Sequence, residues 1–322
     1  MNYSPLLQSV EQKVIDAGYT LLYFGPLPPP HLSPNHNHNN HNICYQASLT
    51  EALRDGCVQC CAPSIADATL SEQYPSYCLE EVCAGRHPYL QGVLVRPSSS
   101  SEEVCAFVVS DGKDIYGNIR QTITQYKAAK TRGVLGPVED TPAAQRFRQD
   151  LLSVQDVSDF VHVTLTATHP SYQRRNLAKC LLCLDLSRWA LRGRQRSFLN
   201  MAIEKRIVYH NNNNEDSGSD TPQVVYAPSL ASRRLYHYFH YRDVYPKYNP
   251  QTREETWSPK EADCGRVMAV FNFVPRVVEI AEEIINEVIK IGAGESASNS
   301  RGRKRSSSPV ISTLHAKRKK KI

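Results

Sequence analysis

The feature that most constrains this chain is a β-like segment that breaks at a proline and continues as an apolar helix. Val161–Thr168 alternates apolar and polar residues, as expected for a strand, and Pro170 follows closely. A helix is then predicted from Asn176 to Leu191. Where a strand gives way to a helix, several main-chain amides lack partners and the helix dipole presents its positive end. The sequence therefore predicts a phosphate or pyrophosphate site in this turn.

Length and composition fit one main domain with insertions. The chain has 322 residues, of which 41% are apolar, enough for one substantial core. No apolar run approaches the roughly eighteen residues of a membrane-spanning helix, and no signal-peptide pattern stands at the N-terminus. Ten cysteines are scattered through apparent strands and helices. We therefore expect a soluble, non-secreted protein with reduced thiols and no membrane partner.

The net charge of +6 is concentrated at one end of the chain. Residues 301–322 hold nine Lys or Arg and no acidic residue, which leaves 29 basic and 32 acidic residues in the rest. This mildly acidic body argues against a broad nucleic-acid-binding face and is compatible with a cationic amine substrate.

Polar tracts divide the chain into segments. The predicted organisation is an N-terminal extension at 1–54 with a disordered His/Asn tract, a main domain at 55–275 with insertions near 111–157 and 209–222, an amphipathic helix at 276–291, and a disordered basic tail at 292–322. Within the domain, we predict helices after Ser64 and Pro75 and at 143–154, 176–191 and 229–239, and strands at 90–96, 104–110, 160–168, 198–203, 224–227 and 266–273.

The order Pro-x-Tyr-Gln-Arg-Arg-x-x-Ala-x-x-Leu-Leu at 170–182 resembles the acetyl-CoA loop of the GNAT N-acetyltransferase superfamily, Gln/Arg-x-x-Gly-x-Gly/Ala. The resemblance implies a mixed α/β sheet with a splayed central strand and acetyl-CoA as co-substrate. Asn176 and Ala178 stand where the family usually has glycine, and Asn tolerates the left-handed backbone region better than most residues. The implied cofactor-binding residues are Ala167, Thr168, Gln173, Arg174, Arg175, Asn176, Leu177, Ala178 and Lys179. The alternative is a basic strand-to-helix turn without a ligand.

A second block, Ser229–Tyr241, resembles the family pattern Asn-x-x-Ala-x-x-Leu-Tyr-x-x-x-Gly-Phe. Leu235 and Tyr236 fall on its Leu-Tyr pair, whereas Ser229, Ser232 and His240 replace its Asn, Ala and Gly. The resemblance implies that Tyr236 protonates the leaving thiolate as general acid. A buried helix aromatic with a satisfied hydroxyl is the structural alternative.

An amine nucleophile must lose a proton, so a general base is also expected. His162 lies on the predicted central strand and has a suitable unperturbed pKa. The arylalkylamine branch of the superfamily, which this strand resembles, carries two alternating histidines there, and Thr164 replaces the second. Glu204, on the next predicted strand, is the other candidate. A purely structural role for His162 stays open.

The cysteines at 57, 60, 61, 78 and 83 have irregular intervals for a zinc site, so we expect buried apolar thiols and no metal. The basic clusters Arg301–Arg305 and Lys317–Lys321 are typical of a nuclear import signal or a nucleic-acid tether, with a merely solvated end as the alternative. An import receptor and a location in the nucleus, or in nucleus and cytoplasm, are therefore expected.

These observations predict an enzyme that transfers acetyl from acetyl-CoA to a primary amine by direct attack in a ternary complex. The local resemblance favours a small arylalkylamine or polyamine as substrate, whereas the basic tail favours a protein lysine. A catalytically silent GNAT-like module that docks on nuclear partners is the alternative.

Overall fold

The structure is a computed structural model that describes residues 3–24, 43–46, 50–61, 89–97, 102–112, 118–132, 141–201, 203–209, 222–228, 230–244 and 266–286. The helix starts predicted at Ser64 and Pro75, the His/Asn tract and the basic tail lie outside these residues. Among the described helices, none combines the length and the apolar character needed to cross a membrane.

Helices and strands alternate along the described chain. In chain order they are α1 (Tyr3–Asp16), β1 (Thr20–Phe24), β2 (Ile43–Gln46), α2 (Glu51–Cys61), β3 (Tyr89–Pro97), β4 (Glu102–Asp111), α4 (Asn118–Thr131), α5 (Pro142–Ser153), β5 (Phe160–Thr168), the short 3-10 helix η1 (Pro170–Tyr172), α6 (Leu177–Leu191), β6 (Arg196–Met201), β7 (Ile203–Tyr209), β8 (Pro222–Pro228), α7 (Leu230–Tyr238), β9 (Arg242–Asp243), β10 (Arg266–Val270) and α9 (Val274–Ile285).

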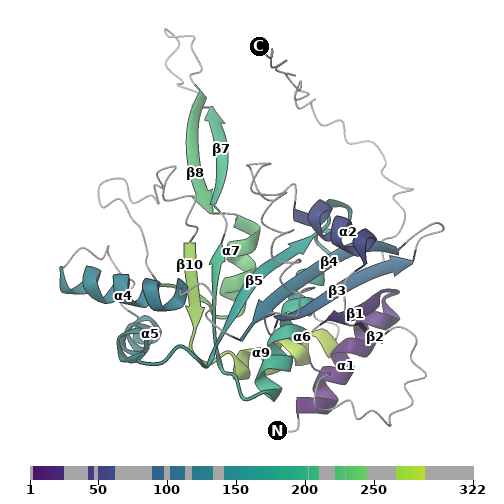
Figure 1. The fold of residues 1–322 in the computed structure, drawn as a ribbon, viewed down its shortest axis with the longest axis horizontal. Helices are drawn as coiled ribbons and strands as arrows, with labels where there is room; N and C mark the ends of the chain where they lie inside the picture. The colour runs from purple at the N-terminus through teal and green to yellow at the C-terminus, as the bar shows by residue number, and fades with distance from the viewer. Residues whose placement is uncertain are drawn as a thin grey trace, which may run out of the picture.

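Eight of the described strands form one mixed sheet in the order β2-β1-β3-β4-β5-β6-β10-β9 (Figure 1). Its pairs are antiparallel except β1–β2 and β5–β6, which are parallel. β7 and β8 pair with each other in a separate two-stranded sheet. Helix α6 is the crossover that joins the parallel strands β5 and β6. The strand order and the parallel β5–β6 pair confirm the predicted fold class, a mixed α/β sheet.

The central strands separate two apolar cores. Val161 and Leu199 belong to a large core with the apolar faces of α1, α6 and α9. Their chain neighbours Phe160 and Phe198 belong to a smaller core with α4 and α5. Successive strand residues point to opposite faces, so the two cores lie on opposite sides of the sheet. Side chains that point to either face of these strands are therefore packed against a core.

Helix α6 has apolar side chains all round because it is covered on several sides. It contacts α1 and α9 as well as strands β3, β4 and β5. Its predicted apolar residues are all buried; they are Leu177, Cys180, Leu181, Leu184 and Trp189. A helix with no polar face is expected only in the interior of a domain.

The folded unit includes the N-terminal segment. Leu7, Val10 and Val14 of α1 lie in the large core, and β1 pairs with β3 along its whole length. The core therefore begins well before residue 55, where the sequence analysis started the domain. The limits proposed for the later segments stay predictions.

A buried polar network crosses from α6 to β4. Trp189 Nε1 donates to Ser110 Oγ at 2.7 Å, and Ser110 Oγ donates to Asp185 Oδ1 at 2.9 Å. Burial raises the pKa of the Asp185 carboxyl to about 6, although the Ser110 hydrogen bond and the Arg188 charge favour its ionised form. Arg188 is itself buried, with its guanidinium 4.1 Å from the centre of the Tyr23 ring. Ionised Asp185 is therefore a cost to the folded state.

We expect Asp185→Asn to remove part of the pH dependence of stability. Because the folded-state pKa lies above the unfolded value of 3.8, the folded state holds the proton more tightly, and the free energy of unfolding falls as pH rises from about 4 to about 6. The fall attributable to this carboxyl is about 3 kcal/mol. Urea titrations at several pH values measure it, with the exposed Asp16→Asn as control. An unchanged slope in Asp185→Asn would contradict the assignment.

Candidate functional site

The central strand β5 loses one neighbour halfway along its length. It pairs with β6 only from Phe160 to Val163, opposite Arg196 to Leu199. On the other side, β4 follows it as far as Thr168. Within the described residues, the main-chain groups of 164–168 on the β6 side therefore have no ladder partner. A strand edge of this kind can pair with an extended ligand.

Buried polar atoms without a hydrogen-bond partner lie on both strands past their last pairs. Among the described residues they include Thr164 Oγ1 on β5 and Asn200 Oδ1 on β6, each just beyond the last paired residue in the parallel register. A buried polar atom without a partner is costly, and such atoms gather where a ligand completes their hydrogen bonds. The opening between β5 and β6 therefore has the chemistry of a ligand site for a group that donates hydrogen bonds.

The turn after β5 is tied to the sheet before α6 begins. His169 accepts from the Ser171 amide through Nδ1 at 3.3 Å, and its own amide donates to Cys105 at 2.9 Å. The Tyr172 hydroxyl donates to Glu103 on β4 at 2.5 Å. These contacts fix η1 against β4 and set the point from which the chain enters α6.

The segment Gln173–Ala178 runs from a loop into the first turn of α6, and the backbone of its loop part alternates between negative and positive φ. Arg174 has φ 64° and Asn176 has φ 59°, both in the left-handed region. When neighbouring residues alternate between right-handed and left-handed conformations, their N–H groups point toward a common centre and can bind an anion there. Asn176 immediately precedes α6, and its side chain makes no capping bond to the helix. The first-turn amides of Leu177, Ala178 and Lys179 therefore add unpaired donors at the positive end of the helix.

The basic side chains of this loop have different environments. Arg175 donates to the Ser171 carbonyl at 3.0 Å and lies over the Tyr172 ring at 4.8 Å, so it is held in place. Arg174 is exposed. Lys179 Nζ lies 4.0 Å from the centre of the Tyr238 ring. Positive side chains therefore lie close to the main-chain donors of this segment.

Relieving the strained backbone at Asn176 is expected to stabilise the protein. Asn176→Gly should raise the free energy of unfolding by about 0.5–1 kcal/mol, because glycine adopts positive φ without a steric penalty. Asn176→Val, with a branched Cβ at the same φ, should lower it by about 1–2 kcal/mol. Thermal unfolding distinguishes the two, and equal stability of both variants would show that the left-handed conformation is not required.

Tyr236 of α7 reaches the open end of β5. It is 7% exposed, and its ring packs edge-on against Tyr241 at 5.8 Å. Burial raises the pKa of the Tyr236 phenol above its ordinary value of 10, and the neighbouring Thr166 side chain acts in the opposite direction. Thr166 is one of the β5 residues beyond the last pair with β6. A phenol that stays protonated at neutral pH therefore lies beside the opening.

His162 lies deeper, in the paired part of β5. Its Nδ1 is 3.4 Å from Asp111 Oδ2 at the end of β4, and both side chains are buried. The imidazole stacks on Phe198 of β6, with ring centres 4.3 Å apart. By strand alternation it shares a face with Thr164 and Thr166. A carboxylate on one imidazole nitrogen orients the ring and supports proton acceptance at the other.

Glu204 lies on β7 opposite Ala227, outside the main sheet, and its side chain is outside the described residues. Within the described part of the chain, the structure therefore brings together the loop 173–179, Ala167, Thr168 and Tyr236 around the open edge, with His162 behind it. The sequence interpretation did not single out Asp111 or Asn200. For Asp111, the polar pair Ser110–Asp111 at the end of an apolar strand could have indicated a buried polar site.

Cys57 and Cys60 on α2 are buried free thiols, as predicted for the cysteines between 57 and 83. Burial raises the pKa of Cys60 to about 12, and its thiol donates to the Val104 carbonyl at 3.6 Å. Cys78 and Cys83 lie outside the described residues.

Comparison with known proteins gives similarity at the level of structure only. No protein-family model matches the sequence, and no curated protein matches it. A ribosomal-protein-S18-alanine N-acetyltransferase from Escherichia coli is 15% identical, with TM-score 0.32, over 70% of this chain and 90% of its own. A mosquito arylalkylamine N-acetyltransferase like 5b is 11% identical, with TM-score 0.30, over 61% and 79%. A PaiA N-acetyltransferase from Thermoplasma acidophilum, solved with coenzyme A, is 9% identical, with TM-score 0.32, over 69% and 95%.

Proposed function

We propose that this chain is an acetyl-CoA-dependent N-acetyltransferase of the GNAT type that acts on a primary amine. The observation that carries the proposal is the meeting of three features at one point. β5 has an open edge from 164 to 168, the buried phenol of Tyr236 lies beside Thr166 on that stretch, and the amide-lined segment Gln173–Ala178 follows its end.

The residues present fit acetyl-CoA. Its diphosphate suits the converging amides of Gln173–Ala178 and the first turn of α6. Its extended amide arm suits the free strand edge at Ala167 and Thr168, next to the unpartnered Thr164 and Asn200 oxygens. When bound, it supplies an acetyl thioester, and the chain supplies position and proton transfer.

Each candidate side chain has one task in acyl transfer. The amine nitrogen forms a bond to the acetyl carbon as the carbon–sulfur bond breaks, so the sulfur needs a proton and the nitrogen must lose one. Tyr236 holds a proton at its phenol oxygen and gives it to the sulfur. His162, whose Nδ1 lies 3.4 Å from Asp111 Oδ2, accepts the amine proton from the side of the opening on which Thr164 lies. Glu204 is the alternative base.

The acceptor is proposed only as a class. A small arylalkylamine or polyamine follows from the strand resemblance, and a lysine on a nuclear protein follows from the basic clusters at 301–305 and 317–321. We propose that these clusters direct nuclear import and bind an import receptor, with nucleic acid as a weaker partner.

A thiol-release assay on the full chain tests the activity. With acetyl-CoA present, we expect free coenzyme A to appear with at least one of tryptamine, spermidine or a histone-tail peptide, and at a rate above that without amine. Release with none of them, combined with no acetyl-CoA binding, would favour the alternative of a silent GNAT-like interaction module. The non-glycine residues at positive φ in the loop are the observation that favours that alternative.

A further inference from the structure

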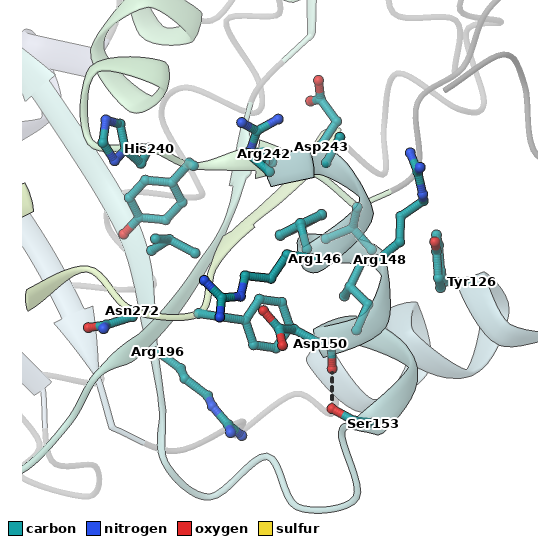
Figure 2. Close-up of a pocket in the computed structure, with 18 of the residues that line it drawn as sticks. Tyr126, Arg146, Arg148, Asp150, Ser153, Arg196, His240, Arg242, Asp243 and Asn272 are labelled. Atoms are coloured by element: carbon teal, nitrogen blue, oxygen red, sulfur yellow. Dashed lines mark hydrogen bonds between the residues drawn. The ribbon is translucent and has the colours of Figure 1, made fainter. Parts of the chain in front are cut away.

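A cavity lies near the start of strands β5 and β6, at the end away from the segment Gln173–Ala178. It has a volume of about 1030 Å³ and is enclosed by α5, β9, the end of β10 and the turn after α7 (Figure 2). Arg196, on its wall, pairs with Phe160 at the start of β5, whereas the loop Gln173–Ala178 follows Thr168 at the end of that strand. The cavity is therefore separate from the proposed acetyl-CoA site. Its volume is in the range of small-molecule pockets.

Positive charge predominates among the side chains that line this cavity. The charged lining residues are Arg146, Arg148, Arg196, Arg242, Asp150 and Asp243. Four guanidinium groups against two carboxylates give the lining a formal charge of +2. Burial and the Arg276 charge lower the pKa of His240, another lining residue, below its usual 6.5, so this imidazole is mostly neutral at pH 7. The cavity therefore favours an anion over an amine.

Arg146 is the cation best placed to meet a ligand. It is exposed on α5, and within the described part of the chain its guanidinium is paired with no carboxylate. Figure 2 shows it reaching from α5 toward the strand side of the cavity, where Asn272 lies. Arginine presents a planar fork that matches carboxylate and phosphate oxygens.

Arg196, on β6, is held by weak contacts. Its guanidinium lies 5.8 Å from the Phe160 ring centre and 5.7 Å from that of Phe271. Its ion pair with Asp159 spans 3.5 Å, and both side chains are more than a third exposed. Exposed pairs of this kind contribute little energy, so Arg196 can turn to an incoming anion at small cost.

Aromatic side chains line the cavity beside these arginines. Phe147 of α5 packs edge-on against Phe271, with ring centres 5.5 Å apart, and Tyr241 closes the α7 side. Aromatic walls beside cations favour a ligand that has an apolar or ring portion as well as its charge. A hydrated inorganic ion would leave this wall uncovered.

We propose that this cavity binds a small organic anion that carries phosphate or carboxylate groups next to a ring. The guanidinium groups of Arg146 and Arg196 hold the anionic group, and Phe147, Phe271 and Tyr241 cover the ring. The proposal goes beyond the acetyl-transfer activity and does not depend on it, because the cavity lies at the start of β5 and the segment Gln173–Ala178 follows its end.

Isothermal titration of the full chain with 1-naphthyl phosphate tests the proposal. We expect one site with submillimolar affinity that persists in saturating acetyl-CoA, because acetyl-CoA occupies the other end of β5. Arg146→Gln should weaken this binding about tenfold, the loss expected for one charge-assisted hydrogen bond. The matched control Arg132→Gln removes the same charge from an exposed position just after α4, outside the cavity, and should leave the affinity unchanged.

Several results would overturn the proposal. Absence of heat at millimolar 1-naphthyl phosphate would show that no such site exists. Equal weakening by Arg146→Gln and Arg132→Gln would assign the binding to diffuse charge. Displacement of 1-naphthyl phosphate by acetyl-CoA would place its binding at the segment Gln173–Ala178. Equally tight binding of neutral 1-naphthol would show that the arginines do not contribute to recognition of the anionic group. Arg196→Gln provides a second variant, for which loss of binding is likewise expected.

Discussion

Replacing Tyr236 by phenylalanine is expected to lower kcat for acetyl transfer about a hundredfold or more, while acetyl-CoA still binds. The ring and its packing against Tyr241 remain, so the only loss is the hydroxyl group that we propose protonates the departing sulfur. Because burial keeps the pKa of this phenol above 10, the wild type should hold the acid in its protonated form throughout neutral pH. The thiol-release assay measures kcat, and titration calorimetry measures the retained affinity.

Tyr126→Phe is the matched control for that experiment. Tyr126 is another buried tyrosine whose pKa is raised by burial, but it lies on α4 in the second core. Loss of its hydroxyl should change kcat less than about threefold, since it takes no part in proton transfer. If Tyr236→Phe turned over as fast as the wild type, another group would have to supply the proton.

Replacing Ala178 by glutamate is expected to abolish detectable acetyl-CoA binding while leaving the fold at least as stable. Ala178 is half-buried in the first turn of α6, where a carboxylate interacts favourably with the helix dipole, by about 0.3–1 kcal/mol. The same carboxylate competes for the amides that would hold the diphosphate and repels it. Stability and binding should therefore move in opposite directions.

Ala178→Gln separates charge from size in this test. Glutamine fills nearly the same volume without the negative charge, so we expect its affinity for acetyl-CoA to fall at most about tenfold. Thermal unfolding of both variants reports stability. Equal loss of binding in the two would mean that bulk at this position, and not charge, decides the outcome.

The central βα unit could be predicted closely from the sequence. β5 has the predicted bounds, and α6 begins one residue after the predicted start, because alternation and an uninterrupted apolar run are strong local signals. The left-handed conformation of Asn176 agrees with the tolerance of asparagine for that region. These features depend on local sequence, which one chain displays directly.

Features that depend on distant contacts could not be predicted in the same way. Helix α4 falls within a segment assigned to a polar insertion, although Ile119, Ile123 and Tyr126 recur at helical spacing and form its buried stripe. The contact of His162 with Asp111 depends on the β4–β5 register and on its bulge near Ser110. The arginine-lined cavity takes its arginines from α5, β6 and β9, which are far apart in the chain.

Titration calorimetry of the full wild-type chain with acetyl-CoA tests the central claim most directly. If the amides of Gln173–Ala178 and the free edge of β5 form the site, heat should saturate at one molecule per chain with an affinity in the micromolar range, and the Ala178→Glu chain should give none. Absence of heat from the wild type at micromolar concentrations, or equal binding by Ala178→Glu, would contradict it.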